Sequence, residues 1–156
     1  MAVVDFPRLE VEVVKAVRAP VPPSFARSVL ARAASLPEVA ARLPEGTSSI
    51  AVRITGDREL RRLNQSFAGK DSATDVLSFA GSGNHLGDLA ISWDAVDRQA
   101  AEFRHPPPAE FALLCVHGML HLLGWDHVSA SERREMVRLS TAALELSGVR
   151  LPAGRL

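Results

Sequence analysis

The chain has only one cysteine, Cys115, among its 156 residues. A single cysteine excludes an internal disulfide bond and is typical of proteins that reside in a reducing compartment. Cys115 lies two residues before His117 in an apolar segment. We therefore interpret it as a small buried hydrophobic residue rather than as a metal ligand.

The sequence also indicates no targeting or membrane segment. Its N-terminus, MAVVDFPRLEVEVV, contains acidic residues early and has no long apolar run. Secretory signals need a continuous apolar region, and membrane-spanning helices need about 20 apolar residues. We therefore expect a cytoplasmic protein that does not bind a membrane.

An excess of charge of either sign is missing as well. The 18 lysines and arginines balance the 18 aspartates and glutamates, so the formal net charge is +0. Proteins that bind nucleic acid nonspecifically usually carry a basic surface, because phosphate contacts dominate their affinity. Any nucleic-acid site on this chain must therefore be a local patch.

What is present is a mixture of strand and helix patterns, without internal repeats or a linker between domains. The length suits one domain with a substantial core. We predict an α+β fold in a single domain over residues 1–156, with a small mixed β-sheet packed with helices. Apolar periodicity and turn residues place the strands at 9–17, 50–55, 75–79 and 86–93, and the main helices at 23–36, 57–67, 94–104, 108–123 and 129–147.

The helix predicted at 57–67 has one apolar face. Asp57 can cap its start. The stripe consists of Leu60, Leu63 and Phe67, which we expect to be buried. Three arginines lie largely opposite this stripe, and we interpret them as an ordinary solvated face, with a phosphate-contacting patch as the alternative. These are Arg58, Arg61 and Arg62.

The helix predicted at 108–123 is different, because residues 111–123 are apolar around nearly its whole circumference. Such a helix is expected in the centre of the fold. Glu110 suits its start, near the positive end of the helix dipole. Ser129 and Glu132 then form a capping box that begins the last helix.

The central helix carries the motif HGMLHLLGWDH, residues 117–127. His117 and His121 are four residues apart, so on a helix their Cβ atoms lie about 5 to 6 Å apart on one face. Gly124 can adopt the left-handed conformation that ends a helix, which lets His127 approach the same ion. Three histidines leave one tetrahedral position open, as in catalytic zinc sites. Zinc is the expected ion, although nickel, copper and iron also accept imidazole.

A glutamate is missing beside the first histidine. In HExxH metalloproteases that glutamate is the general base, whereas Gly118 stands at this position here. An ordinary zinc peptidase is therefore not expected, and the proton of a metal-bound water must pass to another group or to the substrate. Asp126 either orients a histidine ligand or is a turn aspartate, and both interpretations stay open.

The histidine motif resembles HGxLHLxGYDH, the signature of the YbeY family of bacterial single-domain, metal-dependent endoribonucleases linked to ribosomal RNA maturation. Two upstream segments are also similar to the family. GKDSATDVLSF, residues 69–79, resembles GKDxPTDVLSF, and LGDLAIS, residues 86–92, resembles LGDIxIS. Together the resemblance covers roughly residues 50–147.

The resemblance implies a zinc-dependent, single-strand-specific endoribonuclease. It would act in maturation of the 16S ribosomal RNA 3′ end and in ribosome quality control. Its partners would be ribosomal RNA precursors and the ribosome or ribosome-associated proteins, with no small-molecule cofactor. The residues implied in catalysis are Lys70 and the three histidines at 117, 121 and 127, which would bind one zinc ion. Arg53 or Arg61 are further candidates for steadying phosphate oxygens.

Two positions depart from the family pattern. Ala68 stands where an arginine usually precedes the Gly-Lys pair, and Ala80 stands where a proline is common. The first departure leaves open a ribosome-assembly factor with a structural metal and weak or no nuclease activity. A metal hydrolase acting on an ester or amide is a second alternative, against which Gly118 and the upstream motifs argue. His85 is interpreted as a solvated loop histidine, with a proton shuttle as the alternative.

Overall fold

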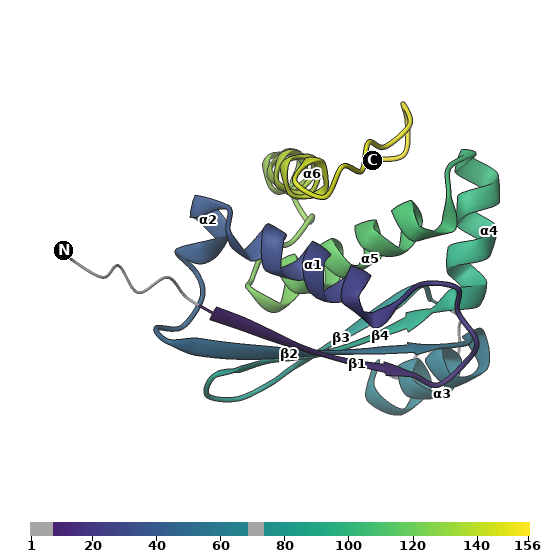
Figure 1. Cartoon of the computed structure of the whole chain (residues 1–156), viewed down its shortest axis with the longest axis horizontal. Coiled ribbons are helices and arrows are strands. Elements are labelled where there is room, and N and C mark those ends of the chain that lie inside the picture. The colour runs from purple at the N-terminus through teal and green to yellow at the C-terminus, as the bar shows by residue number, and fades with distance from the viewer. Residues whose placement is uncertain (1–7, 69–73) are drawn as a thin grey trace.

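The computed structural model describes residues 8–68 and 74–156, and those residues form one mixed sheet and six helices (Figure 1). This architecture confirms the α+β class predicted from the sequence. In chain order the elements are β1 (Arg8–Lys15), α1 (Pro23–Ala34), α2 (Pro37–Ala40), β2 (Thr47–Thr55), α3 (Asp57–Ala68), β3 (Val76–Ala80), β4 (His85–Ser92), α4 (Trp93–Phe103), α5 (Pro107–Leu122) and α6 (Ala130–Glu145).

The four strands have the order β1-β2-β4-β3. β2 pairs in parallel with both β1 and β4, whereas β3 and β4 are antiparallel. Parallel neighbours need a crossover, which α1 and α2 provide between β1 and β2. The turn between β3 and β4 is closed by the Gly81 amide, which donates to the Leu86 carbonyl over 3.0 Å. In the strand order given above, β3 is the last strand and forms one edge of the sheet.

The alternation of side chains in β2 separates the two faces of the sheet. Ile50, Val52 and Ile54 are buried in one core cluster with residues of α1, α5 and α6. Arg53 points the other way and forms an ion pair with Glu59 of α3. Figure 1 shows α3 on the opposite side of the sheet from α1 and α5. The sheet therefore has a main core on one face and a smaller helix contact on the other.

Helix α5 occupies the centre of the main core. It lies between the sheet and α6 in Figure 1, and residues 111–116 are buried with Met119 and Leu120. This confirms the central buried helix expected from its apolar circumference. Cys115 is one of these buried residues, as predicted. Among the described helices, none combines the length and apolar character needed to cross a bilayer.

Helix α3 differs from the prediction at its C-terminal end. Leu60 is fully buried, but Phe67 is 72% exposed, so the expectation of a continuous buried stripe was wrong. The last turn of α3 lies beside the edge strand, where the Phe67 and Phe79 rings meet edge to face at 5.2 Å between centroids. An edge strand has no further neighbour to complete the burial of such a ring.

The start of α3 is also held differently from the prediction. The Asp57 carboxylate forms an ion pair with Arg98 and accepts a hydrogen bond from Ser92 Oγ over 2.6 Å. The backbone amide of Asp57 donates a hydrogen bond of 2.9 Å to the Asp94 carboxylate. Two aspartates therefore link the start of α3 to the start of α4.

Candidate metal centre

The last turns of α5 carry His117 and His121 on one side of a helix in which residues 110–116 and 118–120 are buried. The helix ends as the sequence predicted. Gly124 has φ +95°, its amide donates to the His121 carbonyl, and the Trp125 amide donates to the Leu120 carbonyl, both over 3.0 Å. These two bonds form a Schellman motif, which reverses the chain direction directly after the helix.

The chain after this turn is fixed by Trp125. Its side chain is buried, and its indole Nε1 donates to Glu135 Oε1 of α6 over 3.4 Å. The Arg42 guanidinium lies 3.6 Å from the centre of the Trp125 ring and donates to the Leu123 carbonyl over 3.2 Å. Trp125 thus anchors the segment that carries the next two residues, Asp126 and His127.

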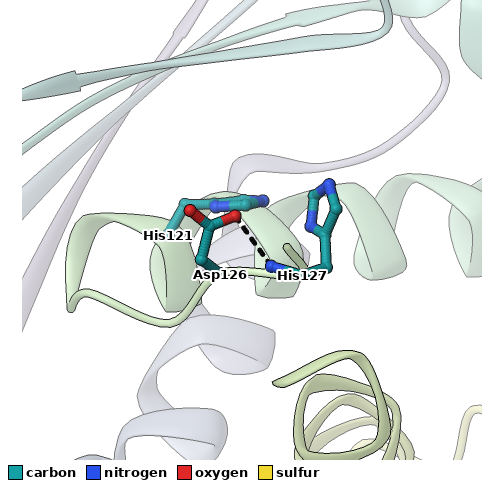
Figure 2. A group of neighbouring side chains, drawn as sticks. All are labelled: His121, Asp126 and His127. Carbon is teal, nitrogen blue, oxygen red and sulfur yellow. Dashed lines mark hydrogen bonds between the residues drawn. The ribbon is translucent and has the colours of Figure 1, made fainter. Parts of the chain in front are cut away.

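Three side chains converge at this point. The nearest ligand atoms of His121, Asp126 and His127 all lie within 4.8 Å of one another. Figure 2 shows His121 extending from the end of α5 toward the ring of His127, with the Asp126 carboxylate beside them. The two ring centroids are 5.1 Å apart, with an interplanar angle of 74°. The Asp126 carboxylate also accepts a hydrogen bond of 2.7 Å from the His127 amide, which fixes its direction.

This donor set suits a divalent transition metal. Two imidazoles and one carboxylate are ligands that zinc accepts, with the remaining position left for water or substrate. The Asp126 carboxylate bonds to the backbone amide of His127, as the turn interpretation expected, and it also stands among the ligand atoms, which neither interpretation from the sequence stated. As a direct ligand candidate Asp126 was missed. Its adjacency to His127 was the available signal.

His117 lies one turn earlier on α5 and is not a member of this group of three. It lines a cavity of about 280 Å³ together with His127. Burial lowers the pKa of His117 to about 4, with a further contribution from the charge of Arg155. Burial, followed by the charge of His127, also lowers the pKa of His121. Both imidazoles are therefore neutral at pH 7, which is the form that binds metals.

The other residues considered from the sequence lie elsewhere. His85 is at the start of β4, where its ring nitrogens contact Ser49 Oγ at 2.8 Å and Asp88 Oδ1 at 3.1 Å. It is thus a hydrogen-bonded strand residue rather than a solvated loop histidine. Arg53 is paired with Glu59 on the far face of the sheet, away from α5. Lys70 lies outside the described residues.

The arginines of α3 are exposed, as expected for a solvated face. Arg58, Arg61 and Arg62 belong to the helix that lies on the opposite side of the sheet from α5 (Figure 1). Arg62 is 3.8 Å from the Glu59 carboxylate. This placement favours the solvated interpretation over a phosphate patch beside the histidines.

A group of residues that sequence reasoning did not bring together lies next to His117. Glu110 is fully buried, forms an ion pair with Arg155 near the C-terminal end, and is hydrogen-bonded to His105 Nε2 at 2.7 Å. Burial alone would raise the Glu110 pKa, but hydrogen bonds from Arg155 and His105 outweigh it and lower the pKa. The sequence held no signal for this pairing, since residues 110 and 155 are joined only by the fold.

Comparison with known proteins identifies a family for this chain. The family model described as Endoribonuclease YbeY matches residues 21–148. The chain belongs to this family. The YbeY resemblance of the three motifs is thereby confirmed, and the matched range adds most of the N-terminal third.

Individual relatives in the YbeY family extend this result. The chain is 44% identical over 129 residues to "Endoribonuclease YbeY" of Chloroflexus aggregans, covering 75% of this chain and 84% of the relative. It is 40% identical over 131 residues to the protein of the same name from an Anaeromyxobacter species, covering 81% and 67%. The solution structure of TM1509 from Thermotoga maritima has the same fold, with a TM-score of 0.62, 23% identity and 88% of each chain covered.

Proposed function

We propose that this protein is a zinc-dependent endoribonuclease that cleaves single-stranded regions of ribosomal RNA precursors. The convergence of His121, Asp126 and His127 at the end of a buried helix is the observation that carries the proposal. Membership of the Endoribonuclease YbeY family supplies the substrate class. The finer role proposed is maturation of the 16S ribosomal RNA 3′ end and ribosome quality control in the cytoplasm, with ribosome-associated proteins as partners.

The proposed zinc ligands are His117, His121 and His127, with Asp126 either beside them or in place of His117. When bound, zinc would polarise a phosphoryl oxygen and make a bound water more acidic. The chain holds His121 by burial on α5 and His127 through the anchored Trp125 segment. Because burial keeps the rings of His117 and His121 neutral, their nitrogens offer lone pairs without first losing a proton.

The chain's own groups would handle the substrate and its protons. Gly118 has no side chain to act as a base, so the Asp126 carboxylate, within 4.8 Å of a ring nitrogen of His121 and of His127, is proposed as the proton acceptor. Lys70, from the motif preceding β3, is proposed to steady a phosphate oxygen. Attack by the RNA 2′-hydroxyl would need no further protein nucleophile.

The proposal is tested with purified protein, structured ribosomal RNA and a chelator. One zinc per chain and chelator-sensitive cleavage are expected. His121→Ala should lose metal and cleavage together, whereas His85→Gln, which changes an imidazole outside the centre, should retain both. Cleavage that survives both the chelator and His121→Ala would overturn the proposal.

The ligand set is tested by metal content alone. His117→Ala and Asp126→Ala are compared at equal protein concentration, with His121→Ala as the reference for loss. A larger fall in zinc affinity for His117→Ala supports the three-histidine set. A larger fall for Asp126→Ala assigns the third position to the carboxylate.

The alternative function is a ribosome-assembly factor with a structural metal. Ala68, at the position of the arginine in the family pattern, is the observation that favours it. Bound zinc without RNA cleavage would support this alternative. Ala68→Arg would then restore cleavage if the missing guanidinium is the cause.

A further inference from the structure

The cavity beside the histidines carries positive charge that the family motifs do not contain. Its volume is about 280 Å³, and His117 and His127 stand in its wall with Arg133 and Arg155. The rest of the lining is Met136, Val137 and Leu156. Two guanidinium groups therefore share one hollow with two of the proposed zinc ligands.

Arg155 comes from a segment beyond residue 148, where the family match ends. Its Nε donates to Glu110 Oε1 over 2.7 Å and its Nη2 contacts the other carboxylate oxygen. Its guanidinium carbon also lies 4.5 Å from the centre of the Phe103 ring. A guanidinium has five N–H groups. The hydrogen bonds of Arg155 to described residues use Nε and Nη2, and they fix the orientation of the guanidinium. Its Nη1 remains available to another acceptor.

Arg133 is held much less firmly. It lies in the first turns of α6 and is exposed, and among residues 8–68 and 74–156 no ion pair or hydrogen bond engages its guanidinium. It also lines a second hollow of about 620 Å³ with Arg134 and Arg138. Arg138 is paired with Glu38 at 2.8 Å, whereas among the described residues no ion pair engages Arg133 or Arg134.

We propose that Arg133 and Arg155 form a phosphate-binding subsite for the RNA backbone, next to the phosphate at the metal centre. Arginine forks match phosphate oxygens in geometry and charge. The inference rests on the proposed function, because it places the reacting phosphate at the histidines. It explains how a chain of zero net charge and with Ala68 in place of arginine holds a polyanion, through a local patch.

Two carboxylates near this subsite are engaged by neighbouring side chains. Glu110 is occupied by Arg155 and His105, and Asp75 accepts a hydrogen bond from Gln99 Nε2 over 3.3 Å. Asp75 and Glu102 add to the negative field that acts on Arg155. Arg133 therefore supplies the larger electrostatic attraction for a phosphate, and Arg155 supplies a guanidinium group whose orientation is fixed.

RNA binding without catalysis tests the subsite. The full chain is treated with chelator and titrated into a fluorescent single-stranded RNA oligonucleotide over a series of salt concentrations. Arg133→Met should weaken binding several-fold and reduce the slope of log affinity against log salt by about 0.7, the value for one phosphate contact on a single strand. Arg150→Met, which removes the same charge from the C-terminal segment but outside this cavity, should change neither quantity.

Arg155 needs a milder change, because its loss would leave Glu110 buried without its cation. Arg155→Lys keeps a positive charge opposite Glu110 but lacks the planar fork. It should weaken RNA binding relative to the unmodified chain while the thermal midpoint shifts by only a few degrees. Unchanged affinity and salt slope for Arg155→Lys would overturn the two-arginine subsite.

The failure of this inference is distinguishable from failure of the proposed function. If Arg133→Met binds RNA as Arg150→Met does while the chelator still abolishes cleavage, the subsite is overturned and the nuclease stands. In the zinc-loaded enzyme, Arg133→Met should raise KM with kcat within about twofold, as for a contact made equally in the ground and transition states. An equal fall in kcat and kcat/KM would contradict a subsite of this kind.

Discussion

Gly118 on α5 lies directly against Leu89 on β4. A Cβ atom at Gly118 would come within 2.7 Å of Leu89 Cδ2 and 2.9 Å of Leu89 Cδ1. The glycine therefore lets α5 approach the sheet closely. A glutamate at this position would point into the core instead of toward the metal centre, which gives a physical reason for the absence of the protease base.

Gly118→Ala is expected to destabilise the protein, although alanine favours helices by about 1 kcal/mol over glycine. Crowding against Leu89 should outweigh this gain and cost about 1 to 3 kcal/mol. The free energy of unfolding in urea measures the effect. Ser131→Ala, an exposed change in α6, serves as the control and should stay within about 0.5 kcal/mol of the original chain. A more stable Gly118→Ala protein would contradict the close approach.

Glu110→Gln should be among the more damaging single changes to stability. It removes the buried anion that pairs with Arg155 and His105, and breaking a buried pair costs about 3 to 5 kcal/mol. Urea unfolding of this variant is compared with that of Glu12→Gln, which removes an exposed carboxylate from β1. Similar stability of the two variants would show that the Glu110 pairs contribute nothing net.

The metal-free protein should lose stability as the pH falls from about 6.5 to about 4. The pKa of His117 in the folded chain is lowered from 6.5 to about 4, so between these values the unfolded chain binds a proton that the folded chain does not. The loss attributable to His117 is of order 2 to 3 kcal/mol, complete near pH 4. Urea midpoints measured across this range check it.

His117→Gln provides the comparison for this pH dependence. It should flatten the slope without abolishing it, because the pKa of His121 is lowered as well and acts in the same direction. Identical slopes for both proteins would mean that His117 is not held in its neutral form by burial.

Phe67→Ala is expected to cost less than about 1 kcal/mol, because the ring is 72% exposed. Leu60→Ala, about two turns earlier on the same helix, removes a fully buried side chain and should cost about 2 to 5 kcal/mol. Thermal unfolding of the two variants separates these cases. Equal losses of stability in the two variants would contradict the exposed position of Phe67 and favour the continuous buried stripe that the sequence pattern predicted.

Local patterns in the sequence were enough to place the elements that build the site. The alternation of Ile50, Val52 and Ile54 with less apolar residues predicted a half-buried strand. The apolar circumference of residues 111–123 predicted the central helix. Gly124 marked the turn, because a left-handed residue is needed there. Ser129 marked the start of α6, where its Oγ accepts from the Glu132 amide over 3.1 Å. Each of these features depends on neighbours a few residues away.

Features that depend on distant neighbours were not predictable from the same patterns. The exposure of Phe67 depends on β3 being the edge strand, which no feature of α3 reveals. Glu110 looked like a dipole-compensating residue because its partner Arg155 is far along the chain. The position of Asp126 among the ligand atoms depends on how Trp125 is anchored, and Arg42, 81 residues before Leu123, takes part in that anchoring.

The contact of Arg42 with Trp125 and with the Leu123 carbonyl has a consequence for how the protein can be divided. Arg42 lies two residues after the end of α2, in the part of the chain without recognisable motifs. A fragment starting at β2 would keep every motif residue, yet it would lose the clamp on the turn between His121 and His127. The N-terminal third of the chain, which has the fewest motif residues, therefore contributes to the arrangement of the candidate metal centre. Shortening the protein to its motifs should leave His121 and His127 present but no longer close together.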